Sequence, residues 1–294
     1  MLRKPIVILG SPRSGTTLLS NLLKFHPEVY LAEEPRILWK YGNDGKSDLL
    51  HAKDARPEVC SHIRNEFSRQ VAEHGATRLV EKTPSNCLRV NFVDRVLEDC
   101  IFVHIVRDGV QSVLSIRDFW TRHSTGMKPQ RIFQRLRELE LRQAPYYFRE
   151  FSRRALGQFA PGMVGPPAWG PRLPGIEQMY RDMDLLELCA AQWRSCVEMA
   201  CRDGRSLPEG RYTECRLEEL CEEELIQIME FCELEPSRVV LDEYRRIYDP
   251  SVPRGRTVNA TSDEIDRVEE LIAPTTTWLA RLSPMDIHRM AMAV

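Results

Sequence analysis

The chain has 294 residues and a formal net charge of −2. A charge so close to neutral gives no field that would attract nucleic acid or an anionic membrane, so any anion site must be local. The nine cysteines form no Cys-x-x-Cys pair, and an odd number in a chain of this length argues against a disulfide framework. The first apolar run is too short for a signal sequence or a membrane span. We therefore expect reduced thiols, a cytoplasmic protein with no membrane span, and a single α/β domain over residues 1–294.

The first predicted strand leads into a helix through a glycine loop. Residues 6–9 read Ile-Val-Ile-Leu, a short β-branched run typical of a buried parallel strand. The leucines that follow have helical spacing, at Leu18, Leu19, Leu22 and Leu23. A loop in this place aims backbone N–H groups and the positive end of the helix dipole at an anion, and Arg13 adds a full charge inside it.

This loop fits the nucleotide-binding template G-x-x-x-x-G-K-[ST] except at its lysine. Gly10 and Gly15 keep the spacing and Thr17 keeps the hydroxyl, but Thr16 stands where the lysine should be. The missing lysine argues against ATP. The loop therefore indicates a site for a phosphate or sulfate ester.

The remaining elements alternate between strands and helices. Short apolar runs predict further strands at residues 29–31, 78–80 and 101–106, with a weaker one at 211–212. Helical patterns cover residues 54–74, 86–97, 183–202 and 216–233. This alternation predicts a central parallel sheet flanked by helices on both faces, of the P-loop-containing nucleotide-binding type. Ligands of such sheets bind beyond the carboxyl ends of the strands.

A second segment that could bind an anion follows the strand at 101–106. The strand delivers Arg107 at its carboxyl end, and a helix that starts near Asp108 places Ser115 two turns further on. Arginine recognises phosphate with two parallel hydrogen bonds, and a serine hydroxyl can complete the site. Alternatively, Arg107 and Asp108 pair with each other or cap the helix. His104 lies inside the strand on the face of Phe102, and we expect it to be a core histidine rather than a catalytic one.

Two later segments have open interpretations. Basic residues are frequent between residues 128 and 155, which predicts either a solvated helix face or a basic surface for an acidic acceptor. Residues 157–175 are dense in glycine and proline and predict a long loop, either a lid or a linker.

The two anion segments together resemble a known family. Pro-Arg-Ser-Gly-Thr-Thr after the first strand, with Val-Arg-Asp-x6-Ser after a later one, is similar to the sulfotransferases that use 3'-phosphoadenosine-5'-phosphosulfate (PAPS). The resemblance implies that the first loop holds the 5'-phosphosulfate and the second segment the 3'-phosphate. The first role would fall to Arg13, Ser14, Gly15, Thr16 and Thr17, and the second to Arg107 and Ser115. It also implies weaker assignments, Tyr212 near the adenine and Arg254, then Arg256, near the 3'-phosphate.

The same resemblance identifies a candidate base. The cytosolic aryl and steroid branch carries a Lys-Thr-His triplet, whereas this chain reads Lys82-Thr83-Pro84, so the usual histidine base is absent. Residues 33–36, Glu-Glu-Pro-Arg, resemble the Glu-Glu-Thr-Arg segment of the Golgi tyrosylprotein branch, and this branch and the bacterial one are the closer matches. By that match Glu34 is the base and Glu33 the fallback. If both acids continue a strand, their side chains point to opposite faces and only one can serve. Without the resemblance they would be two exposed loop acids.

The resemblance implies a sulfotransferase that moves a sulfuryl group from PAPS to an acceptor hydroxyl by in-line displacement, leaving the product PAP (3',5'-adenosine diphosphate). Glu34 would act as general base, while Arg13 and Lys82 stabilise charge on the departing phosphate. No metal is implied, and the acceptor could be a small metabolite, a lipid, a sugar or a peptide, with no nucleic acid partner. One alternative is a P-loop kinase acting on a small molecule, with Asp108 holding a metal. The other is a catalytically inactive nucleotide-binding protein.

Overall fold

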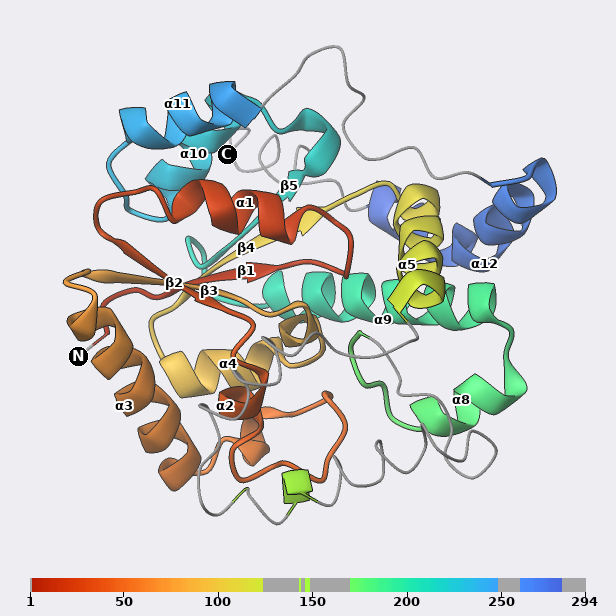
Figure 1. The fold of residues 1–294 in the computed structure, drawn as a ribbon, viewed down its shortest axis with the longest axis horizontal. Coiled ribbons are helices and arrows are strands. Elements are labelled where there is room, and N and C mark those ends of the chain that lie inside the picture. Colours follow the sequence, from red (N-terminus) through yellow and green to blue (C-terminus); the bar gives the residue numbers. More distant parts are fainter. Residues whose placement is uncertain (1, 124–142, 144–145, 149–169, 248–259, 282–294) are drawn as a thin grey trace.

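A five-stranded parallel sheet forms the centre of the protein (Figure 1). The structure is a computed structural model that describes residues 2–123, 143, 146–148, 170–247 and 260–281. The strands are β1 (Ile6–Leu9), β2 (Val29–Glu33), β3 (Arg78–Lys82), β4 (Ile101–Val106) and β5 (Tyr212–Arg216). Their order is β2-β3-β1-β4-β5, and every neighbouring pair is parallel. The predicted fold class is confirmed.

Alternate residues of β1 face two separate apolar cores, as a strand covered on both faces requires. Ile6 and Ile8 pack with α1 (Thr16–Leu23), α10 (Glu222–Phe231) and α11 (Arg238–Ile247). Val7 and Leu9 pack with α3 (Pro57–Glu73), α4 (Val90–Leu97) and α9 (Leu185–Gly204). Figure 1 shows the two groups of helices above and below the sheet.

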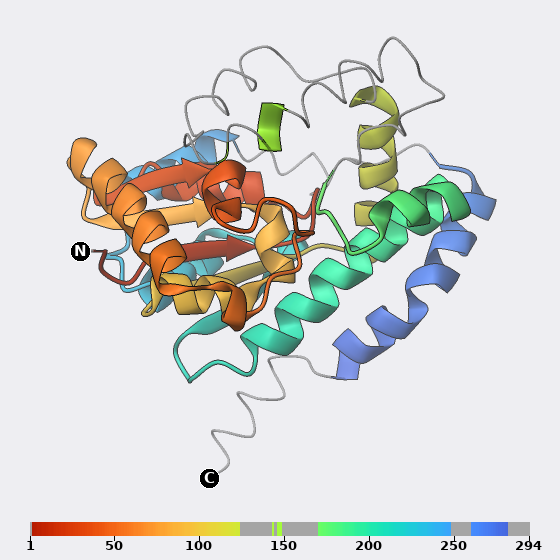
Figure 2. The same cartoon turned by 90° about the horizontal axis from the view of Figure 1, so that it is seen from below.

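The carboxyl ends of the strands all point to one end of the molecule. There α5 (Gly109–His123) and α12 (Ser262–Arg281) pack against α9 (Figure 2). Two short helices are also present, α2 (Arg36–Lys40) and α8 (Ile176–Asp182). Among the described helices, none combines the length and apolar character needed to cross a bilayer.

Two predicted helices differ from the observed ones at their starts. The pattern at 216–233 begins with the last residue of β5 and a 3₁₀ turn (Leu217–Glu219), and α10 starts only at Glu222. The pattern at 86–97 splits into a 3₁₀ turn (Pro84–Leu88) and α4. In both cases the chain is leaving a strand, and its apolar residues are buried by the turn instead of by a helix face. Most of the basic segment 128–155 and residues 157–169 of the glycine- and proline-rich segment lie outside the described residues.

Candidate functional site

The loop between β1 and α1 has a backbone that only particular residues tolerate. Gly15 lies at the start of α1 with φ 97°, in the left-handed region that favours glycine. A Cβ atom there would lie 2.7 Å from the Leu217 Cδ1 atom. Arg13 also has a positive φ, 70°, which is strained for a residue with a side chain. Strain of this kind is typical of loops shaped around a ligand.

The same loop presents buried polar groups toward the start of α1. The Ser14 hydroxyl is buried and has no hydrogen-bond partner within the described part of the chain. A Cβ atom on Gly10 would come within 2.4 Å of this hydroxyl, so glycine makes room for it. The first N–H groups of α1 have no partners inside the helix. The loop therefore fits an anion, as the sequence predicts.

Three predicted residues meet beside this loop. Arg13 Nε donates to Ser115 Oγ at 3.1 Å, and Arg107 Nη1 donates to the carbonyl oxygen of Arg13 at 3.1 Å. The Arg13 guanidinium also lies over the ring of Phe119, 5.5 Å from its centroid. Burial lowers the pKa of Arg107, although Glu218 and Asp108 oppose that shift. The β4–α5 segment thus brings Arg107 and Ser115 to the anion loop, which itself carries Arg13.

The helix cap that the sequence left open belongs to Asp108. Its Oδ1 atom accepts the backbone N–H of Gln111 at 2.8 Å, and its own N–H donates to Glu218 Oε1 at 2.8 Å. Arg107, by contrast, is directed to the carbonyl of the anion loop. Of the two residues that could have capped the helix, Asp108 therefore does so and Arg107 does not.

Lys82 brings a further cation to the start of α1. It ends β3, its side chain is 1% exposed, and its Nζ lies 3.4 Å from Thr17 Oγ1. The same ammonium donates to Glu34 Oε1 at 2.9 Å and lies 3.5 Å from Glu33 Oε1. The lysine beside the start of α1 thus comes from the neighbouring strand β3, whereas the loop itself has Thr16 at the lysine position.

Glu33 and Glu34 do not alternate between the faces of a strand. β2 ends at Glu33, and Glu34 has φ 52°, so the extended backbone stops between them. Both carboxylates consequently approach Lys82, and the condition under which only one of them could serve, that both continue the strand, is not met. Glu34 is the nearer of the two to Lys82 Nζ, at 2.9 Å against 3.5 Å for Glu33. It is also the more buried, since its side chain is 29% exposed and that of Glu33 is 52% exposed.

Arg36 contacts the second oxygen of the Glu34 carboxylate, a role that the sequence did not reveal. Its Nη2 donates to Glu34 Oε2 at 3.0 Å. The carboxylate therefore lies between two cations, Lys82 on one oxygen and Arg36 on the other. The only signal was the position of Arg36 in the Glu-Glu-Pro-Arg segment.

The neighbouring Glu81 anchors the end of β3 from the opposite face. Its carboxylate accepts hydrogen bonds from Trp39 Nε1, Thr83 Oγ1 and Asn86 Nδ2 at 2.8, 2.5 and 2.6 Å. Complete burial raises the pKa of Glu81 to about 7, while the bonds from Thr83 and Trp39 act in the other direction. The sequence signal for this anchor was a glutamate inside an apolar strand, directly before Lys82.

Tyr212 does not join the anion site. It is the first residue of β5, opposite Phe102, whereas the anion loop lies beyond the carboxyl ends of the strands. Its hydroxyl lies 2.8 Å from Glu214 Oε1 and 2.8 Å from His104 Nδ1. The structure thus holds the Tyr212 hydroxyl between His104 and Glu214 and does not bring it to the anion loop, and its assignment near the adenine stays a prediction. Arg254 and Arg256 lie outside the described residues.

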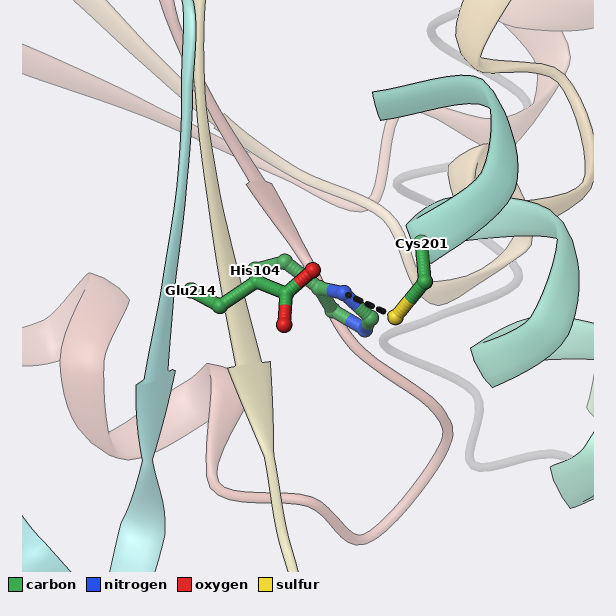
Figure 3. A group of neighbouring side chains, drawn as sticks. All are labelled: His104, Cys201 and Glu214. Atoms are coloured by element: carbon green, nitrogen blue, oxygen red, sulfur yellow. Dashed lines mark hydrogen bonds between the residues drawn. The ribbon is translucent and has the colours of Figure 1, made fainter. Parts of the chain in front are cut away.

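His104, Cys201 and Glu214 form one compact group of potential metal ligands in the described part of the chain (Figure 3). Their ligand atoms lie within 4.8 Å of one another, and Cys201 Sγ lies 3.6 Å from His104 Nδ1. However, Arg205 donates to both oxygens of Glu214 at 2.7 Å, and its charge disfavours a cation beside them. Burial lowers the pKa of His104 to about 4 and raises the pKa of the Cys201 thiol. We interpret the group as a hydrogen-bonded core in which a neutral His104 lies beside the Glu214–Arg205 ion pair, which agrees with the prediction that His104 is a core histidine.

Comparisons with known proteins find that this chain is similar to sulfotransferases. Residues 5–162 match the model of the sulfotransferase family. The protein-tyrosine sulfotransferase of Drosophila melanogaster is 32% identical over 124 residues, which are 38% of this chain and 25% of that protein. Human protein-tyrosine sulfotransferase 1 is 31% identical over 124 residues, which are 38% of this chain and 34% of that protein. Nodulation protein NoeE of Sinorhizobium fredii is 24% identical over 129 residues, 38% of this chain and 31% of that protein. The matches thus span about a quarter to a third of these relatives.

Solved structures support the fold alone. The sulfotransferase from Alicyclobacillus acidocaldarius superposes with a TM-score of 0.54 at 12% identity, covering 96% of both chains. STF9 from Mycobacterium avium superposes with a TM-score of 0.52 at 14% identity, covering 96% of this chain and 77% of the other.

Proposed function

The chain belongs to the sulfotransferase family, and on that basis we propose that it transfers a sulfuryl group from PAPS to an acceptor hydroxyl. One observation carries the proposal: a fully buried lysine lies between the start of the anion-binding helix and a glutamate that can act as base. Lys82 Nζ is 3.4 Å from Thr17 Oγ1 and 2.9 Å from Glu34 Oε1. The site therefore offers an anion cradle and a proton acceptor on the two sides of a single cation.

The residues present fit the two ends of PAPS. Arg13, Ser14 and Thr17, with the N–H groups of residues 15–17, would hold the 5'-phosphosulfate at the start of α1. Arg107 and Ser115 would hold the 3'-phosphate, since they reach the same loop from β4 and α5. When bound, PAPS supplies a sulfuryl group that is activated by its link to a phosphate.

Glu34 is the proposed general base and Lys82 the proposed stabiliser of the leaving oxygen. The bond from the acceptor oxygen to sulfur forms while the bond from sulfur to the bridging oxygen breaks. The electron pair of the broken bond stays on the bridging oxygen, which becomes a phosphate oxygen of PAP. The acceptor proton passes to Glu34, a step worth about 10²- to 10⁴-fold in general-base catalysis. Charge on the departing oxygen is met by Lys82 and Arg13, and losing one such donor typically costs about 2.7 to 4 kcal/mol.

The acceptor is proposed only as a hydroxyl compound. Two of the relatives are named for tyrosine in protein, which makes a tyrosine-containing peptide the first acceptor to test. Small metabolites, lipids and sugars offer the same nucleophile and belong in the same screen.

The kinase alternative needs Asp108 as a metal ligand. The Asp108 carboxylate instead caps α5 by accepting the N–H of Gln111. A P-loop kinase also needs the loop lysine, and Thr16 stands in its place. Both features favour sulfuryl transfer over phosphoryl transfer.

A ligand-binding and transfer assay tests the proposal. We expect PAP to raise the melting temperature more than ADP does, and label from sulfur-labelled PAPS to appear in an acceptor from the screen. Phosphoryl transfer from labelled ATP with Mg²⁺, without PAP binding, would establish the kinase instead. Tight PAP binding that survives Glu34→Ala, with no transfer to any acceptor, would identify an inactive nucleotide-binding protein.

A further inference from the structure

Lys82 contacts the base and the anion loop at once, and this double contact has a thermodynamic consequence. We propose that Lys82 couples the two substrates: it holds Glu34 in an ion pair until an anionic donor enters the loop, and it then shifts toward the donor and frees Glu34 to accept a proton. The inference rests on the proposed function and adds a mechanism of regulation to the same site. Such coupling would make Glu34 effective as a base only when the donor is bound.

The contacts show that one ammonium group serves both sides. Lys82 Nζ lies 2.9 Å from Glu34 Oε1, 3.5 Å from Glu33 Oε1 and 3.4 Å from Thr17 Oγ1. An ammonium has three donors and no acceptor, so an additional anion at the start of α1 competes with these partners. Because the side chain is 1% exposed, water does not screen this competition as it would at the surface.

The charges around Glu34 give the direction of the coupling. Lys82 reaches it from β3 and Arg36 from α2, while Glu33 precedes it at the end of β2. A carboxylate between two cations is a weak base, since both charges favour its ionised form. A donor that draws Lys82 toward α1, and that brings its own negative charge, makes Glu34 a stronger base.

Coupling between two binding events is reciprocal. If the donor strengthens proton binding by Glu34, then removal of the negative charge of Glu34 must strengthen donor binding. Glu34→Gln should therefore bind the donor product PAP more tightly than the wild-type protein does. A Glu34 that acted on the donor only through the field of its charge would instead tighten PAP binding equally with or without Lys82.

Calorimetric titration with PAP at fixed pH and ionic strength tests the inference. We expect Glu34→Gln and Glu34→Ala to lower the Kd for PAP by about 3- to 10-fold, the range of a partly buried ion pair. Glu33→Gln is the matched control: it removes the same charge from a more distant and more exposed position, and we expect a change below about 2-fold. Thermal melts of each variant establish that it is folded.

A double-mutant cycle separates the ion pair from the general field of the carboxylate. In a Lys82→Met background, Glu34→Gln should no longer tighten PAP binding, because the group that transmits the effect is gone. The inference is overturned if Glu34→Gln leaves the Kd unchanged or raises it, or if it tightens binding equally without Lys82. If either result is obtained while the wild-type protein binds PAP and transfers sulfate, the proposed function stands and only the coupling is rejected. Wild-type protein that does not bind PAP overturns both.

Discussion

Arg107 provides the sharpest test of how the nucleotide is held. Its side chain is 5% exposed and its Nη1 is anchored on the carbonyl oxygen of Arg13. A desolvated guanidinium that binds the 3'-phosphate makes charge-assisted hydrogen bonds, each worth about 1.5 to 3 kcal/mol. Arg107→Lys keeps the charge and loses the two-pronged geometry. We expect it to raise the Kd for PAP by about 10- to 150-fold, which is the same energy converted at about 1.4 kcal/mol per factor of ten.

The assay compares two ligands that differ only in the 3'-phosphate. Calorimetric titrations with PAP and with AMP, on wild-type protein and on Arg107→Lys, separate that phosphate from the rest of the nucleotide. AMP affinity should change by less than about 2-fold, because Arg107 is proposed to contact only the group that AMP lacks. Equal weakening of both ligands would refute the reasoning, and it would show that Arg107 acts only by anchoring the Arg13 carbonyl.

The remaining predictions concern the base, the loop and the core histidine. Glu34→Gln should lower sulfate transfer about 10²- to 10⁴-fold, whereas Glu33→Gln should retain most of it, measured as turnover at saturating PAPS. Gly15→Ala should reduce the free energy of unfolding in urea by about 1 to 3 kcal/mol and also weaken PAP binding, because the added methyl meets Leu217 at a residue with φ 97°. Gly75→Ala, with φ 64° and open space around its Cβ, is the control that should leave PAP binding unchanged. Burial lowers the pKa of His104 from 6.5 to about 4, so the unfolded chain takes up a proton that the folded protein does not as the pH falls through this range. Between pH 6.5 and pH 4 the free energy of unfolding of the wild-type protein should therefore fall by about 3 kcal/mol more than that of His104→Gln. If the free energy of unfolding depends on pH equally in the two proteins, this reasoning is contradicted.

Much of the architecture was readable from local pattern. Short apolar runs of two to six residues separated by helical periods predicted the parallel sheet, and Gly10, Arg13 and Gly15 located the loop between β1 and α1. These features are local because backbone conformation at a glycine, and the burial of alternate residues in a strand, depend mainly on adjacent residues. The same patterns misplaced the starts of α4 and α10, where a turn buries the apolar residues instead of a helix.

The sequence by itself determined the five strands, several of the helices between them and which residues stand at the ends of the strands, whereas α8, α11 and α12 were not predicted. Only the tertiary structure decided which of those residues meet. The sheet order sets β3 between β2 and β1, so Lys82 reaches Glu34 and Thr17, which are 48 and 65 residues away along the chain. The positive φ of Glu34 turns its carboxylate toward that lysine, and the parallel direction of β5 leaves Tyr212 at the opposite end of the sheet. Contacts of this kind depend on strand order, register and the packing of distant elements, which no local pattern encodes.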